Sequence, residues 1–215
     1  MWVFATRSRP ENCARFIQSW VTTKATTPVY VRVDSCDPML DEITTLPWPD
    51  QFEIVVGKRV GLSRSINETF ECYPNEPWYG ILADDLVPRT LQWDLELTKV
   101  CGSWNISYPN DGGDRDWPTH PCMGGDLIRA IGWFGFPPCH HYFTDTVWRY
   151  LGQELSNITR LDHIIVEHMH YSVGKSLQDT VYKQSNQHYK TDKLAYRNWI
   201  RSDGPALVER LQCLI

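Results

Sequence analysis

The chain of 215 residues contains no apolar run of about 18 residues, so we expect no membrane-spanning segment. Its first apolar stretch, Trp2–Ala5, meets Arg7 too early to form the apolar region of a secretory signal peptide. The seven cysteines include no C-x-x-C pair, which argues against a disulfide framework and against a zinc knuckle. These absences together predict a cytoplasmic protein with reduced thiols.

Three widespread motifs are also missing. The sequence has no G-x-x-x-x-G-K-[ST], no G-x-G-x-x-G and no G-x-S-x-G. The sequence therefore lacks the main evidence for a P-loop, for a Rossmann dinucleotide site and for a hydrolase nucleophile elbow. The formal net charge of -5 excludes a generic basic nucleic-acid coat, although a local basic patch could still bind phosphate.

The sequence does have ample material for a core, since 42% of its residues are hydrophobic and it contains 10 Trp and 10 Tyr. In the first half, short apolar segments alternate with segments of helical spacing. This alternation predicts an α/β fold: a mainly parallel central sheet with helices on both faces. We expect strands at residues 2–5, 29–33, 52–56 and 79–83, and helices from residue 10, at 61–70 and from Pro88, the last with Leu91, Leu95 and Val100 inside.

The second half is less regular, and it shows neither an internal repeat nor a convincing linker. We therefore expect one domain, with the catalytic part at residues 1–180 and a C-terminal helical extension at 181–215. The expected elements are a loop at 109–118, helices at 125–134 and 145–155, a strand at 164–166, a polar tail at 183–189, and helical segments at 193–200 and 206–214.

Polar residues follow three of the predicted strands. Thr6 and Arg7 follow the first, Asp34 ends the second, and Asp84-Asp85 follow the fourth. Ligands of parallel α/β sheets bind beyond the carboxyl ends of the strands. We therefore expect these side chains to lie side by side.

Asp84 and Asp85 are the first candidates for chemistry, because two adjacent carboxylates after a buried strand repel each other unless a cation offsets them. Mn²⁺ and Mg²⁺ accept carboxylates together with phosphate oxygens. The alternative is that Asp84 caps the next helix. His168 and His170 lie two residues apart after a strand, so one of them could complete a metal site begun by Asp85; the spacing does not say which, and a merely hydrogen-bonded histidine is the alternative.

Asp145 is a candidate general base, because it follows an aromatic segment whose rings could desolvate the carboxylate and raise its pKa. A helix N-cap is the alternative for Asp145, and it is an equal alternative for Asp179. Several cations near the predicted strand ends could meet phosphate groups: Arg7, Arg9, Lys58, Arg59, Arg64 and Lys175.

The order of these features resembles that of nucleotide-sugar glycosyltransferases of the A-type fold, particularly family-two-like inverting enzymes and their small bacteriophage versions. The resemblance covers about residues 2 to 180. The matching segments are 5–10, 33–35, 61–67, 81–85, 131–134, 142–145 and 166–170.

The resemblance implies a role for each matching residue. Asp85 would be the more direct ligand of a divalent cation, with His168 or His170 as the late histidine ligand. Asp145 would deprotonate the acceptor hydroxyl. The commoner motif of the family is Asp-x-Asp, and here Ala83 takes the first place. The residues expected to bind the donor, including Asp34 at its nucleoside, are Thr6, Arg7, Asp34, Arg64, Asn67, Asp84 and Lys175.

The predicted function is the transfer of a sugar from a nucleoside-diphosphate sugar to an acceptor hydroxyl, by an inverting mechanism that depends on Mn²⁺ or Mg²⁺. If the chain is phage-encoded, a hydroxymethylated pyrimidine in DNA is a plausible acceptor, met by basic residues at Arg115 and in 183–201. The alternatives are a non-catalytic nucleotide-sugar-binding domain and a metal-dependent nucleotidyltransferase or nuclease. The sugar, the nucleobase and the oligomeric state stay open.

Overall fold

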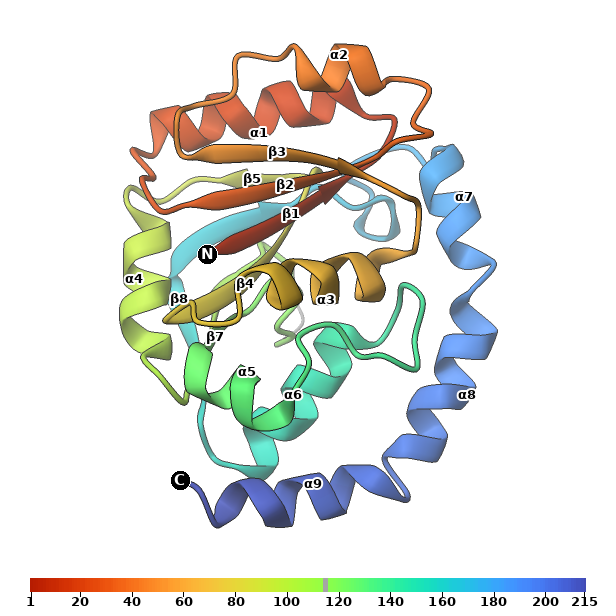
Figure 1. Cartoon of the computed structure of the whole chain (residues 1–215). Coiled ribbons are helices and arrows are strands. Elements are labelled where there is room, and N and C mark those ends of the chain that lie inside the picture. The colour runs from red at the N-terminus through yellow and green to blue at the C-terminus, as the bar shows by residue number, and fades with distance from the viewer. Residues whose placement is uncertain (114–115) are drawn as a thin grey trace.

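A computed structural model describes residues 1–113 and 116–215, and it has the α/β architecture that the sequence predicts. One curled, mixed sheet of eight strands has the order β3-β2-β1-β4-β7-β6-β8-β5 (Figure 1). Its parallel part consists of β1 (Trp2–Thr6), β2 (Val29–Asp34), β3 (Phe52–Gly57) and β4 (Trp78–Ala83).

The alternation of side chains along β1 explains why helices cover both faces of the parallel part. Phe4 packs against Phe16 of α1 (Pro10–Thr22), with ring centroids 4.7 Å apart. Val3 points the other way and shares a core cluster with Ile66 of α3 (Leu62–Cys72). The short helix α2 (Leu40–Thr44) lies on the α1 side (Figure 1).

The segment after β4 differs from the prediction, because Pro88 does not open a helix. It ends β5 (Leu86–Pro88), which pairs antiparallel with β8 at the edge of the sheet, where a proline is tolerated. The helix α4 begins only at Trp93 (Trp93–Cys101). Leu91 and Leu95 are therefore 61% and 40% exposed, and Leu97 is fully buried in their place.

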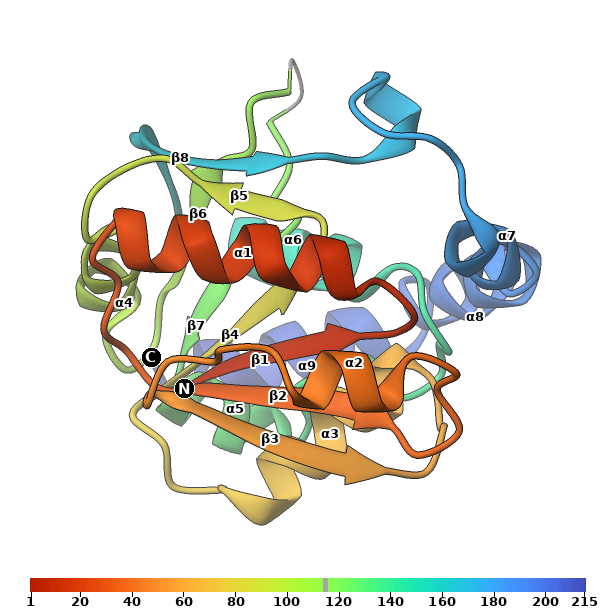
Figure 2. The same ribbon diagram turned by 90° about the horizontal axis from the view of Figure 1, so that it is seen from above.

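The second half contributes more strands than its sequence indicates. The predicted strand at 164–166 is the end of a long strand, β8, and two further strands join the sheet antiparallel to each other. The sheet curls so that β5 and β8 pass over α1 (Figure 2). The elements are β6 (Ile106–Asn110), β7 (Cys122–Gly124), β8 (Ile158–His168), α5 (Gly125–Ile131) and α6 (Thr144–Glu154).

The C-terminal extension is helical, as predicted, but the expected polar tail at 183–189 is largely helix. After a 3-10 turn (Tyr171–Val173), the chain forms α7 (Thr180–Asn186), α8 (Tyr189–Trp199) and α9 (Asp203–Gln212). These helices run around one side of the domain toward α5 (Figure 1). Trp199 of the extension packs against Phe136, with ring centroids 5.1 Å apart, so the extension shares the main core. Among the described residues, no helix combines the length and the apolar character that crossing a membrane requires.

Candidate active site

The carboxyl ends of β1, β2 and β4 meet at one edge of the sheet, as the sequence predicts. The Thr6 hydroxyl donates to Asp84 Oδ2 at 2.8 Å, and Arg7 Nη1 donates to Asp34 Oδ2 at 2.9 Å. A cavity of about 920 Å³ opens at this edge. The predicted site residues that line it are Thr6, Arg7, Asp34, Asp84, Asp85, Asp145, His168 and His170.

Three residues expected to bind the donor do not line this cavity. Arg64 lies on the outer side of α3, with Nη1 2.8 Å from Glu71 Oε1. Asn67 is buried, and its side chain donates to the carbonyl oxygen of Gly135 at 2.7 Å. Lys175 donates to Glu167 at 2.8 Å. The geometry gives these three residues contacts within the protein and no position facing the cavity.

Asp84 is held by contacts within the protein. Its carboxylate is buried and accepts from Arg9 Nη1 at 2.9 Å as well as from Thr6. Burial, helped by the charge of the adjacent Asp85, raises the pKa of Asp84 to about 6 against the opposing charge of Arg9. The next element is β5 and no helix follows directly, so the capping role considered for Asp84 is wrong.

Asp85 is also buried, but it faces two histidines. One of its oxygens and one ring nitrogen each of His120 and His168 lie within 4.8 Å of one another. The distance from His168 Nε2 to Asp85 Oδ2 is 3.3 Å, and the rings of His120 and His168 are nearly perpendicular with centroids 4.8 Å apart. Such a carboxylate with two imidazoles is a plausible ligand set for a divalent ion.

Two polar atoms of this group have no hydrogen-bond partner in the described part of the chain, namely Asp85 Oδ1 and His120 Nδ1. A buried polar atom without a partner is costly, and a cation would offset that cost. Burial would raise the pKa of Asp85, but the hydrogen bond with His168 and its charge keep this pKa well below the usual range. Burial lowers the pKa of His120 to about 3, so its imidazole is neutral and able to coordinate.

The composition of the group bears on which cation fits. Imidazole nitrogens suit transition metals, whereas Mg²⁺ prefers oxygen ligands and retains waters. The Asp85–His120–His168 group therefore has the ligand types of a site for a divalent transition-metal ion. His170 is not a member of this group of described residues, and its Nδ1 is 2.8 Å from the hydroxyl of Ser172. The geometry thus favours His168 as the late histidine.

His120 was missed in the sequence because nothing near it marks a ligand. It lies two residues before β7, whose antiparallel pairing with β4 places Cys122 opposite Gly80. The carbonyl of Pro121 accepts from the backbone N–H of Ile81 at 3.1 Å, which brings His120 beside the end of β4. Only this long-range pairing, which had no signal in the sequence, places the residue at the site.

Asp145 lines the same cavity at the start of α6. Its Oδ2 accepts from the indole N–H of Trp117 at 2.9 Å, and its Oδ1 accepts from the backbone N–H of Thr146 at 2.7 Å. Desolvation raises the pKa of Asp145, opposed by these hydrogen bonds. The residue at the N-cap position is Phe143, so Asp145 is not the N-cap of this helix.

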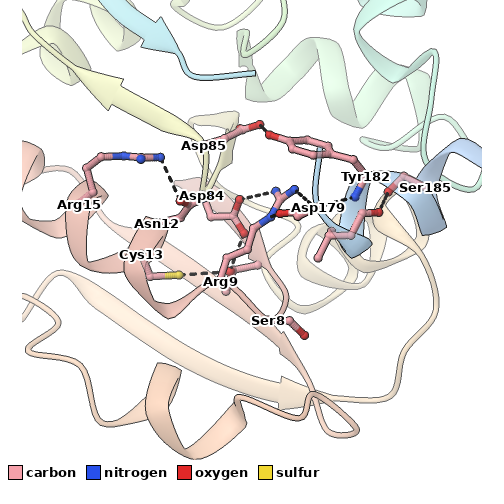
Figure 3. Close-up of polar contacts among 12 residues, drawn as sticks. Ser8, Arg9, Asn12, Cys13, Arg15, Asp84, Asp85, Asp179, Tyr182 and Ser185 are labelled. Atoms are coloured by element: carbon pink, nitrogen blue, oxygen red, sulfur yellow. Dashed lines mark hydrogen bonds and ion pairs between the residues drawn. The ribbon is translucent and has the colours of Figure 1, made fainter. Parts of the chain in front are cut away.

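The C-terminal extension reaches the site through Tyr182 of α7. The Tyr182 hydroxyl donates to Asp85 Oδ2 at 2.7 Å, and Arg9 lies over the Tyr182 ring, 4.0 Å from its centroid. Asp179 is the N-cap of α7, accepting from the Tyr182 backbone N–H at 3.0 Å, and it also binds Arg9 (Figure 3). The capping role considered for Asp179 is confirmed.

Arg115, named in the sequence as a possible contact to DNA, lies outside the described residues. Arg59 is a cation that does reach the cavity. Its Nε is 3.9 Å from Asp34 Oδ2, and its Nη2 donates to Gln184 at 3.0 Å.

Neither a protein-family model nor a curated protein sequence matches the chain. Solved structures do match its fold. A mannosyltransferase from Pyrobaculum calidifontis, in complex with GDP-Man and Mn²⁺, aligns over 99% of this chain and 79% of its own, with a TM-score of 0.59 at 9% identity.

Two further structures extend this likeness. A candidate nucleotide-diphospho-sugar transferase from Desulfovibrio desulfuricans G20 covers 90% of this chain and 96% of its own, with a TM-score of 0.53 at 8% identity. A candidate glucose-1-phosphate thymidylyltransferase from Bacillus anthracis covers 83% of this chain and 96% of its own, with a TM-score of 0.52 at 8% identity. The chain therefore has the A-type fold of the nucleotide-diphospho-sugar transferases.

Proposed function

We propose that the protein transfers a sugar from a nucleoside-diphosphate sugar to an acceptor hydroxyl, with a divalent cation bound by Asp85 and His168 and joined by His120. The observation that carries this proposal is the presence of a plausible metal-binding group and of Asp145 in one cavity, at the ligand-binding edge of the sheet. The mannosyltransferase of similar fold binds GDP-Man and Mn²⁺, which supports the same donor class here.

The donor side of the cavity is supplied by the first half of the chain. Asp34 at the end of β2, together with Arg7, is the proposed contact to the nucleoside. Arg59 adds a positive charge that can meet phosphate oxygens. A divalent cation, when bound, neutralises the charge that develops on the departing diphosphate.

Asp145 is the proposed general base on the acceptor side. It accepts the proton of the acceptor hydroxyl while the hydroxyl oxygen bonds to the anomeric carbon and the bond from that carbon to the diphosphate breaks. Its raised pKa favours this proton transfer, and the indole N–H of Trp117 orients the carboxylate. The step inverts the anomeric centre and requires no protein nucleophile.

A nucleotidyltransferase is the second candidate, because the thymidylyltransferase-like neighbour has the same fold. The two reactions release different products. A glycosyltransferase releases a nucleoside diphosphate, whereas a nucleotidyltransferase consumes a nucleoside triphosphate and releases pyrophosphate. A non-catalytic binding domain releases neither.

The test is a mass-spectrometric survey of products with UDP- and GDP-sugars and, separately, nucleoside triphosphates with sugar phosphates. It is run with Mn²⁺, with Mg²⁺ and with chelator. The acceptor arms are DNA with hydroxymethylated pyrimidines, simple glycosides and a peptide, since the residues described do not favour DNA over another hydroxyl. Release of a nucleoside diphosphate that chelator abolishes supports the proposal. Release of pyrophosphate alone contradicts it.

The seven free cysteines agree with the cytoplasmic location expected from the sequence, in a host cell if the chain is phage-encoded. This location is part of the proposal. Fractionation of cells that produce the untagged chain at a low level tests it, and recovery in the membrane or secreted fraction contradicts it.

A further inference from the structure

We propose that Tyr182 is a positioning residue for the metal-binding carboxylate of Asp85, and that Arg9 and Asp179 latch α7 in the place where Tyr182 can do this. The proposal rests on the cation site of the proposed function, and it extends that site into the C-terminal extension. Nothing in the sequence resemblance reaches this segment, since the resemblance ends at about residue 180.

Asp85 is hydrogen-bonded through only one of its carboxylate oxygens in the described part of the chain. Its Oδ2 accepts from the Tyr182 hydroxyl at 2.7 Å and lies 3.3 Å from His168 Nε2, whereas Oδ1 has no partner in the described part of the chain. Two contacts on one oxygen fix the plane of the carboxylate. These contacts occupy Oδ2, so the lone pairs of Oδ1 remain for a cation.

The helix α7, which carries Tyr182, is held in place by Arg9. Arg9 binds Asp179 through Nε at 2.7 Å and Nη2 at 2.9 Å, and its third nitrogen, Nη1, binds Asp84 at 2.9 Å. The same guanidinium lies over the Tyr182 ring. One arginine of the first half therefore joins the carboxylate next to Asp85 to the residue that caps α7 (Figure 3).

The hydrogen bond from Tyr182 to Asp85 could either orient the carboxylate or block the position of the cation. If the Tyr182 hydroxyl occupied the position of the cation, its removal would tighten metal binding. If it orients Asp85, its removal would weaken metal binding, as happens when hydrogen-bond partners of metal ligands are removed. The unpaired Oδ1 favours the orienting role, because the hydroxyl leaves that oxygen open.

The experiment measures Mn²⁺ affinity by electron paramagnetic resonance of free Mn²⁺, without a sugar nucleotide, on the full chain. Tyr182→Phe keeps the ring under Arg9 and removes only the hydroxyl. We expect its Mn²⁺ affinity to fall by about 10-fold, the lower end of the range for partners of metal ligands. Unchanged or tighter binding by Tyr182→Phe, at an unaltered melting temperature, overturns the proposal.

Tyr171→Phe is the matched control. The Tyr171 ring packs against Tyr182 with centroids 4.7 Å apart, and its hydroxyl accepts from Asn186 at 3.3 Å, so the same kind of atom is removed nearby. Its Mn²⁺ affinity should equal that of the parent. An equal loss in both variants would mean that any change in this aromatic cluster weakens the site, and it would overturn the assignment to Tyr182.

Asp179→Asn tests the latch separately. Asparagine is an equally good N-cap, so α7 keeps its cap while Arg9 loses a charged partner. We expect a smaller loss of Mn²⁺ affinity than in Tyr182→Phe. If Asp179→Asn binds Mn²⁺ as tightly as the parent, the proposed role of Arg9 and Asp179 in holding α7 is wrong.

The outcomes also separate this proposal from the proposed function. If the parent binds Mn²⁺ and releases no nucleoside diphosphate, sugar transfer fails while the Tyr182 assignment is still decided by the variants. If the parent transfers sugar and the Phe variant binds Mn²⁺ equally well, only the Tyr182 assignment fails. A parent that binds no Mn²⁺ overturns both the metal assignment and the role of Tyr182.

Discussion

The two halves of the molecule differ in how their site residues reach the cavity. In the parallel half, Thr6, Asp34 and Asp84 directly end or follow their strands, and neighbouring strand ends bring them together. In the second half, His120 and His168 come from β-structure whose partners lie far away in the sequence. The comparison teaches that side chains at parallel strand ends can be predicted from local sequence patterns, whereas the Asp85–His120–His168 group depends on antiparallel pairing.

Asp145→Asn should produce the largest effect, because it should lower turnover and leave donor binding unchanged. Asparagine keeps the shape and removes the basic lone pair, so turnover should fall by about 100- to 10,000-fold, the usual range for a lost general base. Donor binding should persist, because Asp145 is not among the proposed contacts to the donor or to the cation. Calorimetry with a nucleoside-diphosphate sugar, a melting curve and a turnover assay measure the three quantities. Full turnover at an unchanged melting temperature would remove Asp145 from the mechanism.

The helix α4 provides a second comparison, between a buried and an exposed leucine two residues apart. Leu97→Ala should lower the free energy of unfolding by about 2–5 kcal/mol, because Leu97 is fully buried. Leu95→Ala should change it by no more than about 0.5 kcal/mol, because Leu95 is 40% exposed. Denaturant titration of both variants tests this. Equal losses would restore the helix orientation that the sequence predicts.

The histidine that ends β8, His168, and the one two residues later, His170, offer the finest comparison. His168→Ala should weaken Mn²⁺ binding by roughly 10-fold or more, since changes to the partners of ligands already cost that much. His170→Ala should leave Mn²⁺ affinity close to that of the parent, because His170 is not part of the Asp85–His120–His168 group. Titration with Mn²⁺ decides between them. A larger loss in the His170 variant would reverse the assignment.

The same contrast explains how much the sequence could predict. The strands β1 to β4 are short apolar or β-branched segments that alternate with helical segments, so the fold class and the edge with Asp34, Asp84 and Asp85 were predictable. The sequence predicts a helix from Pro88, the last residue of β5, because proline is typical of helix starts as well as of sheet edges. Only its pairing with β8 distinguishes the two.

Residues outside these local patterns could not be found in this way. His120 precedes a strand of only three residues, Cys122–Gly124, whose place depends on pairing with β4 and β6. Tyr182 reaches Asp85 from 97 positions away, through contacts with Arg9 and Asp179. Asn67, in contrast, matched a motif but donates to the backbone of Gly135. A motif gives the neighbourhood of a residue and leaves the direction of its side chain open.

The central claim is that Asp85, His120 and His168 bind one cation. The most direct measurement is a crystal structure with Mn²⁺ and a nucleoside diphosphate, with anomalous diffraction recorded above and below the manganese edge. The account predicts one anomalous peak within bonding distance of a carboxylate oxygen of Asp85 and of a ring nitrogen of each histidine. A manganese peak coordinated by His170 in place of His120, or none beside Asp85 in crystals that contain the nucleotide, would contradict it.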